Sequence, residues 1–383
     1  MKHIFVIGDC LADEPMKDLA GRTPLEAART PHLDRMAREG QVGRASFVHR
    51  AEMISRDAAC LATLGYNPAE FYTGIAPLES VCYNADPGDG GMVFRADLVT
   101  LLDDALVDQT AGWISDGEAG TLVSALLEKI DIPGMEFKKG SGYKNFLVIK
   151  DPALTGEMRK VTCPSPSEAW GHKASKHFPR GKKAKILKEW MDAAKAVLEA
   201  HEVNRVRIDL GENPGNFIWF WGEGASPKMP SFQQLHGKPG MLHSETDFAK
   251  GLAKLVGLSP AKDIPSALNH SDLLVIHQGN AQRISPADEL KNKIKRIEEL
   301  DAVIGTVLKE NKSDEALKIC VTTDLFESTP KKKFTRDQVP FLIWGAGVAA
   351  DEVDSFSEKA ASQSRQIFEE GYPLMDFFVG GKK

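Results

Sequence analysis

The chain has 383 residues, of which 42% are hydrophobic and 27% are charged, and its formal net charge at pH 7 is -6. This length exceeds what one ordinary hydrophobic core supports, so we expect two domains or a core with an insertion. The mild acidity gives no electrostatic footprint for nucleic acid, and no apolar stretch approaches the roughly 20 residues of a membrane span. The five cysteines are scattered without a Cys-x-x-Cys motif, which argues against a zinc ribbon or a disulfide framework. We therefore expect a cytoplasmic protein with no nucleic-acid or membrane partner.

The first predicted strand ends in a carboxylate. Residues 4–7 form a continuous apolar run that Gly8 and Asp9 follow, and this pattern is typical of a strand buried on both faces of a parallel sheet. In open α/β sheets, ligands bind outside the carboxyl ends of the strands. Asp9 is therefore a candidate metal ligand or general base. The alternative is a loop aspartate that caps the next turn.

Helices are predicted in the rest of the first third. Two Thr-Pro pairs, at 23–24 and 30–31, each match a helix N-cap followed by proline at the first helical position. A loop that begins near residue 53 enters a further helix at 57–64, which ends at Gly65. A helix N-terminus after a loop is where an anion or a nucleophile is usually placed.

The middle of the chain changes character. A strand is predicted at 92–101, a helix at 118–130 and a long loop at 162–183, which is rich in proline, serine, lysine and histidine. Residues 183–200 carry apolar side chains at helical spacing, and we expect that stripe to pack in a core. We expect residues 116–187 to form an inserted α+β domain.

Strands and helices alternate again in the second half. The predicted strands are 216–222, 272–277, 316–323 and 339–344, and the predicted helices are 247–256 and 290–309. Such alternation predicts a mostly parallel sheet with helices on both faces. We therefore expect an α/β core that is split in sequence into residues 1–115 and 188–383.

Short motifs spread from the first residues to about position 350 carry a resemblance to a known family. They include Gly8-Asp9, Gly21-Arg-Thr-Pro-Leu-Glu-Ala-Ala28, Leu64-Gly-Tyr-Asn-Pro68, Trp219-Phe-Trp-Gly-Glu-Gly224 and Ser328-Thr-Pro330. Together they resemble the archaeal-type cofactor-independent phosphoglycerate mutases of the alkaline phosphatase superfamily. The resemblance implies an alkaline-phosphatase-like sheet and a two-metal site, usually manganese or zinc. It also implies a serine that is phosphorylated and returns the phosphoryl group to the other hydroxyl of phosphoglycerate.

Most of the site residues that the resemblance implies are replaced in this chain. The implied metal-binding positions are Asp9, Arg56, Gln282, Pro286, Asp324, Leu325 and Phe334. Only Asp9 and Asp324 keep a ligand side chain. The position of the serine nucleophile is Arg56, although Ser55 lies one residue earlier.

Other residues are expected around this degenerate site. We expect Asp57, Cys60, Arg95 and Lys144 to line a substrate pocket. Glu327 could reach inward as a ligand. Cys10 and Cys60 are also expected near the site, where a buried structural cysteine is more common than a nucleophile. His243, His270 and His277 are candidates for substitute ligands, and surface or core histidines are the alternative.

We hypothesise that Arg56 pairs with Asp9 and Asp324 and replaces the metal as their counter-ion. The reason is that two buried carboxylates without a partner are costly. Two carboxylates can still hold one hydrated magnesium ion. We therefore expect no cofactor, or, if there is one, a weakly bound divalent cation, magnesium or manganese.

These replacements favour a catalytically silent relative of the mutases, a pseudoenzyme with a binding or regulatory role. Its partner would be a phosphorylated small molecule or a protein. One alternative is an enzyme with remodelled chemistry that uses Ser55, Cys10 or Cys60. Another is an active phosphoglycerate mutase, or a different phosphotransfer enzyme, with a remodelled metal site.

Overall fold

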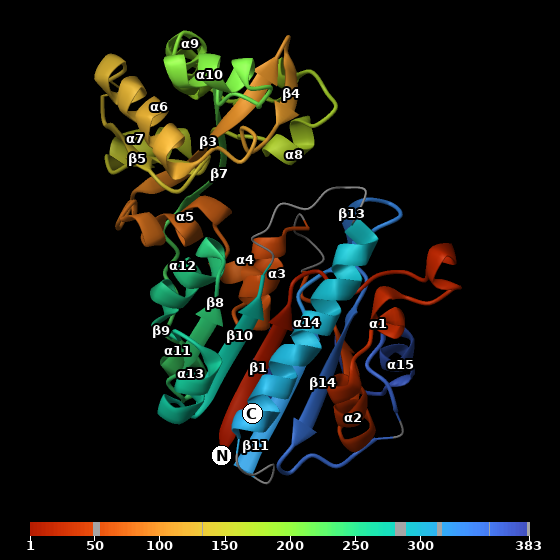
Figure 1. Ribbon diagram of the computed structural model, residues 1–383. Coiled ribbons are helices and arrows are strands. Elements are labelled where there is room, and N and C mark those ends of the chain that lie inside the picture. The colour runs from red at the N-terminus through yellow and green to blue at the C-terminus, as the bar shows by residue number, and fades with distance from the viewer. Residues whose placement is uncertain (49–53, 132, 280–288, 312–315, 352, 381–383) are drawn as a thin grey trace. The chain divides into compact units, whose positions relative to one another are not determined.

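The computed structural model describes residues 1–48, 54–131, 133–279, 289–311, 316–351 and 353–380 (Figure 1). They form two compact units. The first joins residues 1–72 to residues 229–383, and the second holds residues 73–228. Among the described residues, no helix combines the length and the apolarity that crossing a lipid bilayer requires.

The first unit is built on a sheet with the strand order β15-β2-β14-β11-β1-β10-β8-β9. These strands are β1 (Lys2–Gly8), β2 (Gln41–Ala45), β8 (Met241–Ser244), β9 (Ser259–Pro260), β10 (Leu273–Gln278), β11 (Leu317–Thr323), β14 (Val339–Gly345) and β15 (Ile367–Phe368). The central strand β1 is parallel to both of its neighbours, β10 and β11, whereas β14 is antiparallel to β11 and β2. The prediction of a mostly parallel sheet is confirmed.

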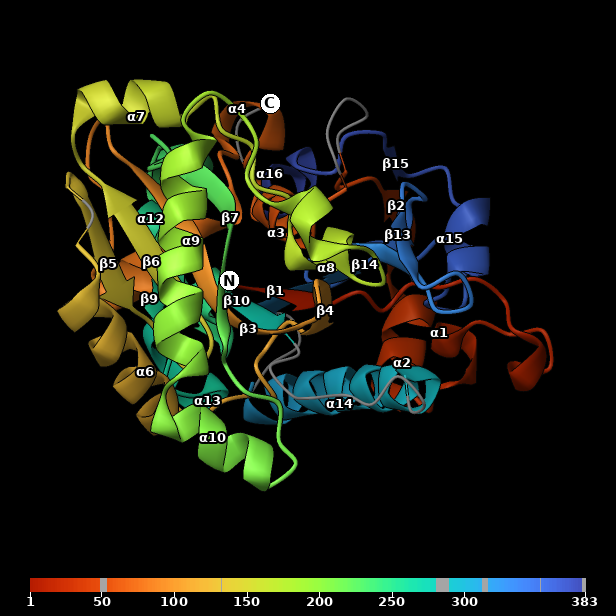
Figure 2. The ribbon, with the colours of Figure 1, turned by 90° about the horizontal axis from the view of Figure 1, so that it is seen from above.

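Helices cover both faces of this sheet, as predicted (Figure 2). They are α1 (Pro24–Ala27), α2 (Pro31–Glu39), α3 (Arg56–Thr63), α4 (Pro68–Phe71), α11 (Phe232–His236), α12 (Asp247–Val256), α13 (Ile264–His270), α14 (Glu289–Glu310), α15 (Glu358–Gln363) and α16 (Pro373–Val379), with a 3-10 turn at Lys17–Leu19. A hairpin of β12 (Phe326–Ser328) and β13 (Lys333–Thr335) follows β11. Helices α2 and α14 lie on one face, and α3 and α16 lie on the other.

The core of the first unit explains why α14 packs where it does. Ile297, Leu300, Ile304 and Val307 recur at spacings of three and four residues, and all are fully buried. This stripe packs against residues of β1 and β10 such as Ile4. Burying each such side chain contributes about 1.5–3 kcal/mol, so α14 is fixed against β1, the strand that Asp9 directly follows.

The second unit holds a five-stranded sheet with the order β4-β3-β6-β5, and β7 also pairs with β3. Its strands are β3 (Met92–Leu102), β4 (Ala105–Asp108), β5 (Met135–Lys139), β6 (Asn145–Ile149) and β7 (Phe217–Ala225). Its helices are α5 (Ile75–Ser80), α6 (Asp116–Lys129), α7 (Pro152–Met158), α8 (Pro166–Ala169), α9 (Ala184–Glu199) and α10 (Glu202–Asp209), with 3-10 turns at Val81–Tyr83 and Ala174–His177. Trp190 of α9 stacks on Phe137 and contacts Phe220, so the predicted apolar stripe does pack in a core.

The second unit is wider than the insertion expected at residues 116–187. Strand β3 precedes that range and β7 follows it, yet the two pair antiparallel from Met92 opposite Ala225 to Val99 opposite Phe217. Strand β3 also pairs with β6, which lies inside the range. Because these backbone hydrogen bonds join strands far apart in sequence, β3 and β7 belong to the same unit as the predicted insertion.

Candidate functional site

The structure brings Asp9 and Asp324 together at the carboxyl ends of two neighbouring strands. Gly8 of β1 is opposite Thr323 of β11, so the residue that follows each strand lies at the same edge of the sheet. The backbone N–H groups of Cys10 and Leu325 both donate to Asp324 Oδ1 at 2.8 Å. Asp9 is 3% exposed and Asp324 is 1% exposed.

The Asp9 turn keeps a backbone shape that normally requires glycine. Cys10 has a φ of 53°, in the left-handed region that glycine adopts without steric cost. This turn places the Cys10 N–H on Asp324 and its thiol beside both carboxylates. Burial raises the pKa of the Cys10 thiol well above its usual range, so the group is a neutral thiol unless a metal ion binds it.

Burial also dominates the protonation of the carboxylate pair. Loss of solvation and the negative charge of Asp9 raise the pKa of Asp324 to about 7, while the charge of Arg56 opposes that rise. Two carboxylates that share a buried site resist double ionisation. The pair therefore needs a nearby cation to carry its full charge at neutral pH.

Arg56 supplies one such cation. It is the first residue of α3, and its Nε lies 3.2 Å from Asp9 Oδ1. The carbon of its guanidinium lies 5.7 Å from the centre of the Phe334 ring, which comes from β13. The hypothesis that Arg56 pairs with Asp9 matches this geometry. Among the described residues no ion pair joins Arg56 to Asp324, so its effect there acts through the electrostatic field.

Ser55 has a local role in starting α3. It is the N-cap of the helix, and its hydroxyl accepts a hydrogen bond from Ala58 N at 3.4 Å. The same hydroxyl donates to Asp57, which also accepts from the Tyr72 hydroxyl. Asp57 thus ties the cap to Tyr72 and closes the first turn of the helix.

The other replaced ligand positions offer no metal ligand where they are described. Leu325 is buried and apolar, and Phe334 presents its ring to Arg56. Gln282 and Pro286 lie outside the described residues.

Glu327 Oε2 lies 3.6 Å from Lys293 Nζ, so this carboxylate pairs with a lysine. Cys60 is 2% exposed, and burial raises the pKa of its thiol well above the usual range, which is typical of an inert structural cysteine.

Arg95 and Lys144 belong to the second unit, where both contact buried carboxylates of the same unit. Arg95 is 2% exposed, and its Nε and Nη2 donate to Asp97 at 2.9 and 2.7 Å while Nη1 donates to Glu79. Lys144 Nζ lies 3.5 Å from Glu79. Trp221 Nε1 also donates to Asp97 at 2.7 Å. The charges of Arg95 and Lys144 thus face carboxylates of the chain itself. Their predicted role in a substrate pocket stays a prediction.

Two cations of α14 were missed from the sequence. Arg296 Nη1 donates to the backbone oxygen of Asp9 at 2.9 Å, and Lys293 Nζ donates to Asp13 Oδ2 at 2.8 Å. Lys293 is fully buried and continues the stripe of Ile297 and Leu300 at a spacing of four and three residues. A lysine in an otherwise apolar stripe is the signal that could have identified it.

A second carboxylate with a perturbed pKa lies on α15. Glu358 accepts hydrogen bonds from Asp13 N at 2.8 Å and from the Thr23 hydroxyl at 2.7 Å. Burial nevertheless raises its pKa to about 7. The folded protein therefore binds this proton more tightly than the unfolded chain does, and the associated stability is full at pH 4 and lost as the pH rises through 7.

We expect Glu358→Gln to remove this pH dependence. Relative to the variant, the wild type should lose about 2–3 kcal/mol of unfolding free energy between pH 4.5 and pH 7.5. Glutamine can accept from Asp13 N and donate to Thr23, so the local contacts persist. Urea unfolding of both proteins across this pH range measures the difference. The same change of unfolding free energy with pH in both proteins would contradict the prediction.

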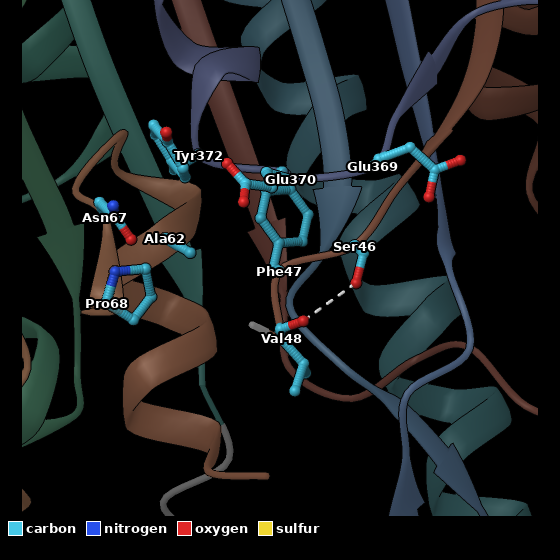
Figure 3. A pocket seen from close by; sticks show the side chains of 10 residues that line it. Ser46, Phe47, Val48, Ala62, Asn67, Pro68, Glu369, Glu370 and Tyr372 are labelled. Atoms are coloured by element: carbon cyan, nitrogen blue, oxygen red, sulfur yellow. Dashed lines mark hydrogen bonds between the residues drawn. The ribbon is translucent and has the colours of Figure 1, made fainter. Parts of the chain in front are cut away.

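Figure 3 shows a cavity of about 400 Å³ elsewhere in the first unit. Its walls are Ser46 to Val48, Ala62, Asn67, Pro68 and Glu369 to Tyr372. The Phe47 ring points into the space between the segment that carries Pro68 and the segment that carries Glu370. None of the predicted site residues lines this cavity, so it is separate from the group around Asp9.

Comparisons with known proteins agree with this architecture. A family profile described as 2,3-bisphosphoglycerate-independent phosphoglycerate mutase matches residues 37–204. The mutase of that name from Methanothrix thermoacetophila is 34% identical over all of both chains. The cofactor-independent phosphoglycerate mutase structure from Thermoplasma acidophilum is 26% identical with a TM-score of 0.61, covering 99% of each chain. A Pyrococcus horikoshii protein structure, 24% identical, has a TM-score of 0.79 and covers 100% of this chain and 98% of its own.

The expectation that no cofactor is bound is wrong in the light of these relatives. They are 2,3-bisphosphoglycerate-independent mutases, a class that depends on divalent metal ions. The structure fits one such ion, because ligand atoms of Asp9, Cys10 and Asp324 all lie within 4.8 Å of one another. Although several implied ligands are replaced in the sequence, these three groups still converge. Among the described residues, no second group of this kind is present.

Proposed function

Because the chain belongs to the family of 2,3-bisphosphoglycerate-independent phosphoglycerate mutases, we propose that it keeps the mutase fold and binds ligand without transferring a phosphoryl group through a serine. The observation that carries the proposal is the ion pair between Arg56 and Asp9, 3.2 Å from Nε to Oδ1. It stands where the resemblance places the nucleophile and its metal. We assign the protein a binding or regulatory role.

The chemistry of Arg56 supports this proposal. A guanidinium stays protonated at any physiological pH and cannot attack phosphorus. The nearest serine in sequence, Ser55, uses its hydroxyl to cap α3 and to donate to Asp57. Moving the attacking oxygen by one residue at a helix N-terminus changes the direction of the side chain. Reacting groups must meet within about 3–3.5 Å with aligned orbitals.

The number of ions that the site fits also supports the proposal. Two-metal phosphotransfer sites stabilise both the attacking and the leaving oxygen of an in-line displacement. Here the described residues offer one group of three ligand atoms. Where Leu325 and Phe334 replace implied ligands, no lone pair is available for a second ion. Loss of a nucleophile alone costs about 10⁶ in kcat in a serine hydrolase, so we expect turnover to be suppressed by several orders of magnitude.

The alternative is phosphotransfer through Ser55, and one observation favours it. The Ser55 hydroxyl contacts a carboxylate, Asp57, and lies 3.4 Å from the Tyr72 hydroxyl. A carboxylate in contact with a hydroxyl can act as its general base. The relatives that match the whole chain are named as mutases, so this candidate is tested beside the first.

Conversion of 3-phosphoglycerate to 2-phosphoglycerate tests the proposal directly. We expect a kcat/KM at least about 10⁴-fold below that of the Methanothrix relative with magnesium, manganese, zinc or cobalt ions present. Any residual rate should be the same in Ser55→Ala. Turnover near that of the relative, abolished by Ser55→Ala, would replace the proposal with the alternative.

A further inference from the structure

One carboxylate oxygen of the site lacks a partner. Asp324 Oδ1 accepts two backbone N–H groups, but Oδ2 is buried and has no hydrogen-bond partner among the described residues. The Asp324 side chain is 1% exposed, and a buried polar atom without a partner destabilises a fold. Ligand atoms of Asp9 and Cys10 lie within 4.8 Å of a ligand atom of Asp324. A cation among the three would satisfy the unused oxygen.

Arg56 limits this site to one ion. Its Nε lies 3.2 Å from Asp9 Oδ1, and its permanent positive charge repels a second divalent cation at short range. A guanidinium has no lone pair for a metal. Leu325 is buried beside Asp324, and its side chain offers no ligand atom either.

Arg56 also has hydrogen-bond donors to spare. The contact with Asp9 involves Nε, and the terminal nitrogens have no hydrogen bond or ion pair within the described part of the chain. The side chain is 46% exposed, so solvent and ligands reach it. The Phe334 ring, 5.7 Å from the guanidinium carbon, and Asp9 hold the group from two sides. The remaining donors form a fork of the geometry that binds phosphate and carboxylate groups bidentately.

We propose that this site binds the phosphate group of a phosphomonoester between one divalent cation, held by Asp9 and Asp324, and the fork of Arg56, which takes the place of a second ion. The inference rests on the proposed function, because the ligand is bound and not turned over. A phosphate group presents three terminal oxygens, so one can ligate the ion while two accept from the guanidinium. Cation and phosphate should therefore bind cooperatively.

Manganese binding tests the first half of the proposal. Titration of the full chain with Mn²⁺, followed by the electron paramagnetic resonance signal of the free ion, should give one site per chain. Asp324→Asn should weaken that site by at least about tenfold, since it replaces a charged ligand. Two sites per chain, or none, would overturn the proposal.

Binding of 3-phosphoglycerate tests the second half. Calorimetry should show that Mn²⁺ tightens its binding to the wild type, and that Arg56→Gln weakens binding by about tenfold or more. Arg38→Gln on α2 removes the same charge from an exposed side chain and should leave the affinity unchanged. Arg56→Gln must still bind one Mn²⁺, which shows that it folds. Equal affinity in the two variants would overturn the role of Arg56.

The two proposals fail in different ways. If 3-phosphoglycerate binds as expected and is also converted at a rate near that of the relative, the proposed function fails. If 3-phosphoglycerate is not converted, and its affinity changes neither with Mn²⁺ nor in Arg56→Gln, the proposed function stands and this inference fails. Conversion and binding are measured on the same preparation, so the two outcomes are separable.

Discussion

Replacing Arg95 with methionine is expected to lower the free energy of unfolding by about 3–5 kcal/mol, because removing one partner of a buried ion pair leaves the other charge uncompensated. Arg95 is 2% exposed and contacts both Asp97 and Glu79. Burial, together with the negative charge of Glu79, raises the pKa of Asp97 despite the guanidinium beside it. Without Arg95, the two carboxylates would have to take up protons or solvent. Urea unfolding followed by tryptophan fluorescence measures the loss.

Two controls separate this ion pair from simple loss of volume. Arg205→Met removes an exposed arginine of α10 in the same unit, and we expect a change within about 0.5 kcal/mol. Adding Asp97→Asn and Glu79→Gln to Arg95→Met should restore part of the lost stability, because no buried charge then lacks a partner. A loss below about 1 kcal/mol for Arg95→Met would show that the network contributes little to folding.

In the first unit, Lys293→Met is expected to lower the free energy of unfolding by roughly 3–5 kcal/mol, about as much as Arg95→Met. Lys293 and Asp13 are both fully buried, and Lys293 Nζ donates to Asp13 Oδ2 and to the backbone oxygen of Glu327, each at 2.8 Å. The lysine therefore joins α14 to the loop after β1 and to β12. Its removal would leave Asp13 with a buried charge and Thr329 as its remaining side-chain partner.

Lys295 provides the matched control on the same helix. It is exposed and lies 3.4 Å from Glu299, one turn further along α14. Such surface pairs contribute at most about 0.5 kcal/mol, so Lys295→Met should scarcely change the unfolding midpoint in urea. Equal unfolding midpoints in urea for Lys293→Met and Lys295→Met would show that the buried Lys293 network does not stabilise the first unit as expected.

The sequence located much of the candidate site because strand ends are visible in it. The apolar run before Asp9 and the one before Asp324 predicted two strands whose carboxyl ends carry carboxylates. Once Gly8 and Thr323 are opposite each other in parallel strands, those carboxylates must be close. Motif spacing placed Arg56 and Phe334 at the same site, and the structure has the guanidinium carbon 5.7 Å from the ring centre.

Other parts of the site depend on partners that no local pattern reveals. Arg296 donates to the Asp9 backbone, and Tyr72 donates to Asp57, yet neither residue belongs to a motif that predicts these contacts. The width of the second unit was missed for a similar reason. Pairing between β3 and β7 joins residues more than a hundred positions apart, and periodicity within each strand does not say which strand lies beside it.

The ligand positions in the sequence do not by themselves predict whether this site fits a metal ion. Replacement of several ligand positions predicted no cofactor, or at most a weakly bound divalent cation. The structure instead retains a turn in which Cys10 has a φ of 53°, and this turn aims a backbone N–H and a thiol at Asp324. Asp324 Oδ2 is left buried and without a hydrogen-bond donor among the described residues. A residue can ligate an ion only if the fold brings its ligand atom close to other ligand atoms.

We expect that no serine of this site becomes phosphorylated when the protein binds 3-phosphoglycerate. Intact-mass spectrometry tests it most directly, after incubation with 3-phosphoglycerate and Mn²⁺ and rapid quenching in acid. We predict an unmodified chain, and the Methanothrix relative, which is named as a mutase, is treated in parallel as the positive control. A chain heavier by one phosphoryl group, with the modification mapped to Ser55 and absent from Ser55→Ala, would contradict the account and identify the protein as a phosphotransfer enzyme.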